Sequence, residues 1–128
     1  MHITITPIFA AILALIFVGL SMRVAGFRRR EKIAVGDGGN AMLQRAIRAH
    51  GNFIEYVPIA LLILAFLEMR NVGIYVMIIL GALLLVGRCS HAYGISNPDE
   101  TYTFRIVGII LTFIVIGVGS LWLLLTYL

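Results

Sequence analysis

The stretch that decides the fold is residues 44–56, QRAIRAHGNFIEY, which runs directly into residues 57–67, VPIALLILAFL. The second part is soluble in hydrocarbon, whereas the first carries ionisable and amide side chains. Ionisable groups at membrane depth are costly and usually mark a site. This polar start of an apolar helix therefore indicates a membrane protein and the part of the chain that carries its function.

The composition of the whole chain agrees with a membrane protein. Of its 128 residues, 61% are hydrophobic and 12% are charged, whereas soluble domains have about 45–50% apolar and about 25% charged residues. The excess apolar surface must face lipid. The length suits one domain, so we expect residues 1–128 to form a single unit.

Four apolar segments predict four membrane helices, over roughly residues 4–26, 41–68, 73–93 and 103–127. A spanning helix needs about 20 residues, and the second and third segments reach that length only by including polar residues. Turn signals lie at residues 36–39, at residues 70–73 and in a loop over residues 94–100. The expected fold is therefore an all-α, antiparallel bundle of four transmembrane helices.

Single residues add detail to the predicted helices: a cap, a proline, interfacial aromatic residues and packing glycines. Asn40 is the expected N-cap of the second helix, and Pro58 is expected to lie within that helix. Aromatic residues suited to a membrane interface are Tyr75, Trp122 and Tyr127. Five glycines of the third and fourth helices are expected to allow close packing: Gly81, Gly87, Gly108, Gly117 and Gly119.

The basic residues predict the orientation. Of the ten Lys and Arg residues, only Arg70 lies in the turn between the second and third helices. The positive-inside rule then places the other two connections in the cytoplasm and both termini on the non-cytoplasmic side. The first segment could instead be a signal peptide, but its basic residues follow the apolar run, which favours a retained helix. Juxtamembrane arginines explain the net charge of +4 without nucleic acid as a partner.

The polar residues of the second helix predict a binding site. Arg45, Arg48, Asn52 and Glu55 are spaced by 3, 4 and 3 residues, which places them on one helical face beside Tyr56. Arg88 and His91 of the third helix and Arg105 of the fourth are expected at the same depth. Arginines bind carboxylates through paired hydrogen bonds, and Asn52 and Glu55 suit an amide and an ammonium group. A pocket for a small anionic, peptide-like molecule or a thiolate is expected; alternatively, Glu55 only forms intramembrane ion pairs with Arg48 or Arg88.

Two further residues have simpler interpretations. His50 points away from this stripe and is expected to be a contact between helices. Only His50 and His91 could offer imidazoles to a metal here, with no matching cysteine or carboxylate spacing, so no metal is expected. Cys89, the single cysteine, cannot form an intrachain disulfide and is expected to be a small packed residue rather than a catalytic thiol.

Residues 48–58, RAHGNFIEYVP, resemble the signature of the MAPEG family, the membrane-associated proteins in eicosanoid and glutathione metabolism. The family pattern is close to R-A-x-x-N-x-x-E-x-x-P on the second of four membrane helices. Residues 36–39, GDGG, and residues 87–94, GRCSHAYG, are similar to the bacterial branch, which implies a bacterial inner membrane location.

The resemblance implies a homotrimer that binds glutathione, as co-substrate, between adjacent subunits near the cytoplasmic face. An apolar second substrate would arrive from the membrane lipids. Arg105 would be the catalytic residue that stabilises the thiolate, and Arg23 would be donated across the subunit interface. The other implied glutathione contacts are Arg48, Asn52, Glu55, Tyr56, Arg88 and His91.

Three positions depart from the eicosanoid-forming members: Gly51, Ile95 and Ile106 lack the arginine, tyrosine and hydroxyl group expected there. The resemblance therefore favours general glutathione conjugation or hydroperoxide reduction, with glutathione or another small thiol. Two alternatives stay open. One is a non-catalytic protein of the same fold that binds a lipid or small molecule, and the other is a structural subunit whose polar stripe only joins helices.

Overall fold

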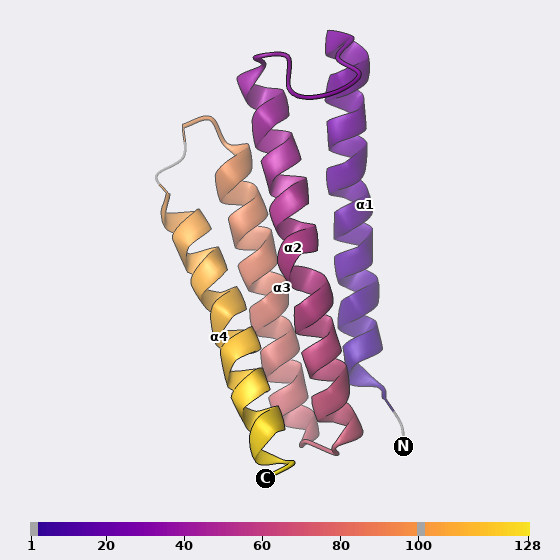
Figure 1. The fold of residues 1–128 in the computed structure, drawn as a ribbon, viewed down its shortest axis with the longest axis vertical. Helices are drawn as coiled ribbons and strands as arrows, with labels where there is room; N and C mark the ends of the chain where they lie inside the picture. Colours follow the sequence, from indigo (N-terminus) through magenta and orange to yellow (C-terminus); the bar gives the residue numbers. More distant parts are fainter. Residues whose placement is uncertain (1–2, 100–101) are drawn as a thin grey trace.

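The computed structural model describes residues 3–99 and 102–128, which form four long helices running side by side in alternating directions (Figure 1). They are α1 (Ile5–Glu31), α2 (Ala41–Met69), α3 (Ile74–Ser96) and α4 (Thr103–Leu125). Each is long and apolar enough to cross a membrane. The predicted all-α, antiparallel four-helix bundle is confirmed.

Two helices extend several residues beyond their predicted ends. α1 continues beyond residue 26 to Glu31, because arginines are good helix formers and the next turn signal comes only at Gly36. α3 continues beyond residue 93 to Ser96, so the predicted loop starts too early; Glu100, its predicted end, lies outside the described residues. Gly94 is buried against α4, where a Cβ atom would lie 2.9 Å from the backbone nitrogen of Arg105. It is a packing glycine rather than a helix breaker.

α2 begins and continues as the sequence predicts. Asn40 Oδ1 accepts a hydrogen bond from the Leu43 N–H at 3.0 Å, which confirms the N-cap. Pro58 lies inside one uninterrupted helix. α2 and α3 form the middle of the bundle, since α1 and α4 both pack on them and no contact joins α1 to α4 within the described ranges. The buried core includes Phe53, Leu64 and Leu84.

Glycines allow close helix packing at four of the five predicted positions. A Cβ atom on Gly108 would lie 2.5 Å from the Gly87 carbonyl oxygen, so these two glycines mark the closest approach of α3 and α4. Gly81 faces the ring of Phe9 from α1, and Gly119 faces Ile63 from α2. The prediction is wrong for Gly117 in the single chain, because a Cβ atom there would have no described atom within 4 Å.

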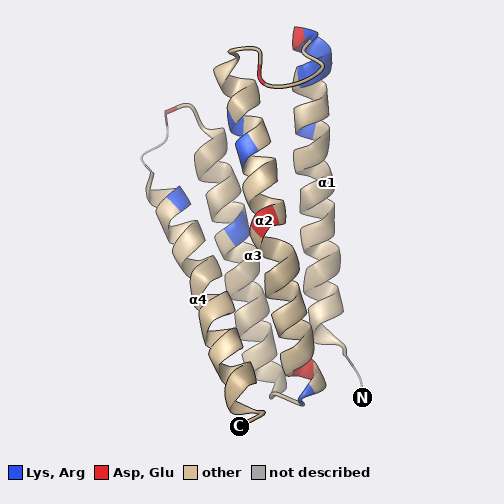
Figure 2. Cartoon of the chain, in the orientation of Figure 1, with Lys and Arg blue, Asp and Glu red and all other residues tan. Residues whose placement is uncertain are grey.

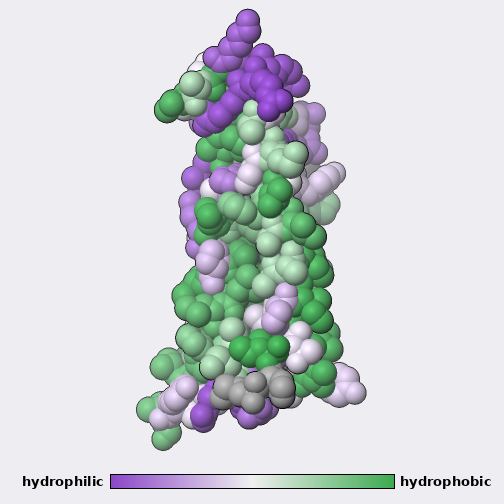
Figure 3. Space-filling view, turned by 90° about the vertical axis from the view of Figure 1, so that its right-hand side faces the viewer, coloured by the Kyte–Doolittle hydropathy of each residue, from purple (hydrophilic) through white to green (hydrophobic). Residues whose placement is uncertain are grey.

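Charge is unevenly distributed along the bundle. Most Lys and Arg residues lie at the end formed by the start of α2 and the end of α1 (Figure 2). Glu68 and Arg70 lie near the two termini, where they contact Thr4 and Thr126. Between these ends, the face seen in Figure 3 is mainly hydrophobic. Tyr75, Trp122 and Tyr127 are exposed near the termini, as an interfacial belt requires.

Glu68 joins the end of α2 to the beginning of α1. Its carboxylate accepts hydrogen bonds from the backbone N–H groups of Thr4 at 2.7 Å, Ile5 at 2.6 Å and Thr6 at 2.8 Å. The N-cap residue of α1, Thr4, makes no side-chain cap of its own. A carboxylate from another helix therefore satisfies the free N–H groups of the first turn of α1.

Candidate functional site

A groove of about 420 Å³ opens between α2 and α4 in the half of the bundle that carries the basic residues. It is lined by Asn52, Tyr56, His91, Tyr102, Arg105, Ile106 and Ile109. A second hollow, of about 300 Å³, shares Tyr102 and Arg105 with it and is also lined by Ala41, Gln44, Arg45, Arg48 and Ile95. We call these two hollows together the polar groove.

Arg88 lies buried beside the polar groove. It is only 1% exposed, and its Nη2 donates to Asn52 Oδ1 at 2.9 Å, while its guanidinium carbon lies 5.7 Å from the centre of the Tyr56 ring. Its Nε and Nη1 have no hydrogen-bond partner among the residues described. A buried cation with unfilled donors is costly, so this arrangement favours an additional anion or acceptor nearby.

The contact with Arg88 also determines what Asn52 can offer. Asn52 lines the polar groove, and because its Oδ1 accepts from Arg88, its Nδ2 group remains as the donor that it can offer to a ligand. A carboxylate or amide carbonyl is the natural acceptor for it. Tyr56 and His91 line the same groove, and His91 is buried one turn after Arg88.

Arg105 lies where the two hollows meet, at the start of α4. Its guanidinium lies 5.7 Å from the centre of the Tyr102 ring. Ser90 donates to the Phe104 carbonyl at 2.8 Å, which ties α3 to the first turn of α4 and holds Arg105 beside the groove. Tyr102 was not predicted as a site residue from the sequence. Its position three residues before Arg105 was the signal that could have identified it.

Arg48 and Glu55 do not converge with the other residues. They form an ion pair of 3.8 Å with side chains that are 58% and 49% exposed. Arg48 borders the polar groove, whereas Glu55 lines neither of its hollows. Of the ion pairs considered from the sequence, the structure thus contains the pair of Glu55 with Arg48.

Arg23 and Arg45 contact the end of α3. Arg23 donates to the Ser96 hydroxyl and, at 3.4 Å, to the Ser96 carbonyl. Arg45 donates to the carbonyls of Ile95 at 3.2 Å and Asn97 at 3.1 Å. Cations are stabilising at helix C-termini, where carbonyls lack partners. Arg23 therefore contacts α3 rather than lining the polar groove of its own chain.

The predictions for His50 and Cys89, which assigned both residues to packing, have different outcomes. His50 stacks on Phe17 of α1 with ring centres 4.8 Å apart, which confirms a contact between helices. Cys89 is exposed, so the prediction of a packed residue is wrong for the single chain. The buried face of this part of α3 contains Gly87, Arg88 and His91, and Cys89 lies outside it.

Comparisons with known proteins identify the family. The profile of the MAPEG family matches residues 6–125. The chain is also 39% identical, over 93 residues, to "Inner membrane protein YecN" of Escherichia coli K12, covering 73% of this chain and 71% of that protein. The protein of the same name in Escherichia coli O6:H1 matches to the same extent. This four-helix, multi-pass membrane protein therefore belongs to the MAPEG family.

Proposed function

We propose that this protein is a membrane-embedded glutathione transferase, able also to reduce lipid hydroperoxides. The observation that carries the proposal is buried Arg88, which is anchored to Asn52 beside a groove that Arg105 also lines. Glutathione is a small, flexible peptide with two carboxylates, two amides and a thiol. These groups match the guanidinium, amide and phenol groups gathered around the groove.

Arg105 is the proposed catalytic residue. A nearby guanidinium favours the charged form of a thiol, because opposite charges attract strongly in a partly desolvated site. The thiol proton leaves to solvent, and the thiolate attacks the electrophilic carbon of the second substrate. A C–S bond forms as the leaving group departs with its electron pair. With a hydroperoxide, two glutathione molecules would give the disulfide, water and an alcohol.

The second substrate is proposed to be apolar and to enter from the bilayer. Ile106 and Ile109 line the polar groove on the α4 side, and Phe113 further along α4 packs against Tyr56 at 5.5 Å between ring centres. Ile106 and Phe113 are exposed on the single chain. This apolar side of the groove suits a lipid-soluble electrophile.

A homotrimer is proposed as the functional assembly. The ion pair of Arg48 with Glu55 is exposed on the single chain, although Glu55 is followed in α2 by a long apolar stretch. Charged side chains in membrane helices almost always face protein or water-filled cavities. A neighbouring copy beside α2 would cover this pair, and Arg23 is the proposed contact that the neighbour supplies. Native mass spectrometry of the detergent-solubilised protein tests the trimer.

The test of the proposed function is a titration with glutathione that follows thiolate absorbance, combined with turnover of a reactive aryl halide. Wild-type protein should bind the thiol, form thiolate and conjugate the halide, whereas Arg105→Ala should bind but lose thiolate formation. Arg29→Ala is the matched control, since Arg29 is exposed on α1 outside the groove. Absence of binding at millimolar glutathione would reject the proposal, and ligand binding without turnover would favour the non-catalytic alternative.

The location proposed is the bacterial inner membrane, as the name of the similar Escherichia coli protein states for that protein. The basic end of the bundle would face the cytoplasm and both termini the other side. The polar groove would then open near the cytoplasm, where small thiols are abundant.

A further inference from the structure

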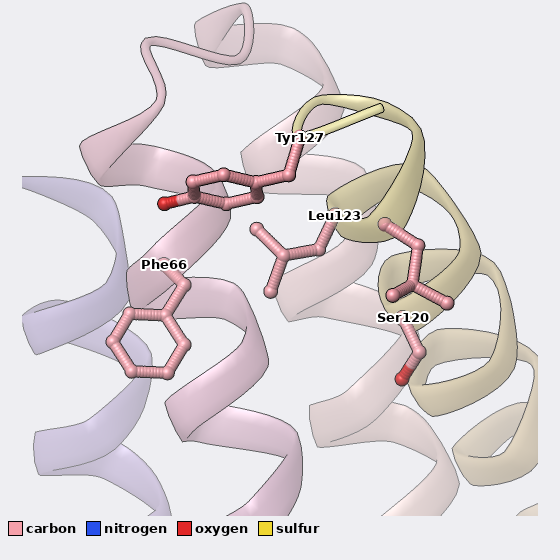
Figure 4. A pocket seen from close by; sticks show the side chains of 5 residues that line it. Phe66, Ser120, Leu123 and Tyr127 are labelled. Carbon is pink, nitrogen blue, oxygen red and sulfur yellow. The ribbon is translucent and has the colours of Figure 1, made fainter.

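At the opposite end of the bundle from the polar groove, an apolar groove of about 470 Å³ lies between α2 and α4. Phe66 borders it from α2, Ser120, Leu123 and Leu124 border it from α4, and Tyr127 borders it from just beyond the end of α4. Figure 4 shows the Tyr127 ring lying across the end of the groove, with Leu123 and Phe66 beneath it. Phe66, Leu124 and Tyr127 are exposed, so the groove is accessible to lipid from the side.

A cation lies at the end of this apolar groove. Arg70 follows the last turn of α2, and its Nη2 donates to the Thr126 carbonyl at 3.0 Å. Its guanidinium carbon lies 4.7 Å from the centre of the Tyr127 ring. Both contacts hold the exposed guanidinium beside the groove, at the level where lipid headgroups meet the protein.

No carboxylate neutralises Arg70 in the part of the chain that the structure describes. The nearest acidic residue in sequence, Glu68, directs its carboxylate to the first turn of α1 instead. Arg70 therefore combines an uncompensated positive charge with an adjoining apolar groove. This combination is complementary to a molecule with an anionic head and a long hydrocarbon chain.

We propose that the apolar groove binds one acyl chain of an anionic phospholipid and that Arg70 holds its phosphate. A second copy of the chain fits less well: Glu68 is its one acidic residue near this end within the described ranges, and that carboxylate already accepts three hydrogen bonds. A phospholipid supplies both the anion at the interface and the hydrocarbon below it. The inference is independent of the proposed thiol chemistry, because this groove lies at the other end of the bundle.

The experiment uses the full chain in detergent, with phosphatidylglycerol and phosphatidylcholine of identical acyl chains as probes. Native mass spectrometry measures the lipid retained per chain. Arg70→Gln removes the charge and Arg70→Lys keeps it. Ser120→Trp fills the apolar groove, and Ile114→Trp places the same ring on an exposed position of α4 outside it. Thermal unfolding confirms that each variant is folded.

Wild type should retain phosphatidylglycerol about fivefold better than phosphatidylcholine, the effect of roughly one interfacial cation. Arg70→Gln should abolish this preference, Arg70→Lys should keep it, and Ser120→Trp should lose both lipids while Ile114→Trp binds as wild type. Equal retention of the two lipids by wild type would overturn the proposal. So would unchanged lipid retention by Ser120→Trp together with a smaller oligomer, which would assign the groove to a neighbouring copy.

Discussion

Arg88 is held inside the bundle by one hydrogen bond to Asn52, with two further nitrogens lacking hydrogen-bond partners among the described residues. A buried cation of this kind does not stabilise a fold, and well-packed apolar replacements of buried charges are often neutral or stabilising. Arg88 is therefore better explained as a binding residue than as a packing residue.

Arg88→Met is expected to leave the free energy of unfolding unchanged or to raise it by about 1–4 kcal/mol, because the desolvated charge is removed while most of the volume is kept. The same change should weaken glutathione binding at least about tenfold, through loss of a charge-assisted contact. Denaturant unfolding in detergent and calorimetric titration measure the two effects.

Asn52→Ala should have the opposite effect on stability. It leaves the Arg88 guanidinium without its acceptor, so the free energy of unfolding should fall by about 1–3 kcal/mol. Greater destabilisation by Arg88→Met than by Asn52→Ala would show that Arg88 has a packing role instead.

At the scale of the helices, the position of α4 against α3 determines the width of the polar groove. The two backbones meet at Gly87 and Gly108, and a Cβ atom on Gly108 would lie 2.6 Å from the backbone nitrogen of His91. Gly108 is one turn from Arg105, so any separation at this crossing moves Arg105 away from His91 and Asn52.

Gly108→Ala should lower the free energy of unfolding by about 1–3 kcal/mol through overpacking and should also weaken thiol binding. Gly117→Ala is the matched control on the same helix, because its Cβ atom would meet open space in the single chain. That variant should be neutral or more stable by up to about 1 kcal/mol. Equal effects of the two variants would contradict the importance of the Gly87–Gly108 crossing.

Glu68→Gln should destabilise the attachment of α1 to α2. The amide offers one acceptor oxygen and no charge to three N–H donors, so a loss of about 2–3 kcal/mol is expected. Glu31→Gln, at the exposed pair with Arg30, should change stability by less than about 0.5 kcal/mol. The hydrogen-exchange rate of the Thr4, Ile5 and Thr6 amides should rise only in the Glu68 variant. Equal protection in both variants would show that Glu68 does not cap α1.

The helix spacing predicted the polar face of α2 but not the partner of each residue. Arg45 reaches the end of α3, Arg48 and Glu55 pair at the surface, and Asn52 holds Arg88. A helical wheel gives the direction of each Cβ atom, whereas the rotation of neighbouring helices and the reach of arginine decide where charges meet. Glu68 could not be found in this way, because its partners lie 62 to 64 positions earlier in the chain.

At the scale of the whole molecule, the long apolar helices predicted the bundle directly, since composition and length limit a membrane chain to few folds. The concentration of basic residues at one end (Figure 2) gives the bundle a strong asymmetry. Arg70 is the exception at the other end.

Alkaline phosphatase fused after Leu128 should therefore be active, and the same enzyme inserted at Gly38 should be inactive, because the basic end stays in the cytoplasm. Green fluorescent protein at the same two positions should give the reverse pattern. Fluorescence from the C-terminal fusion would invert the proposed orientation and place the polar groove on the non-cytoplasmic side.

The hydrogen bonds between Glu68 and the first turn of α1 have a consequence for biogenesis. The acceptor for these amides is synthesised more than sixty residues after them. Until α2 has passed through the translocon, the backbone N–H groups in the first turn of α1 must stay hydrated among the lipid headgroups. Insertion of the first two segments as a hairpin would deliver the carboxylate and its donors to the same leaflet at the same moment.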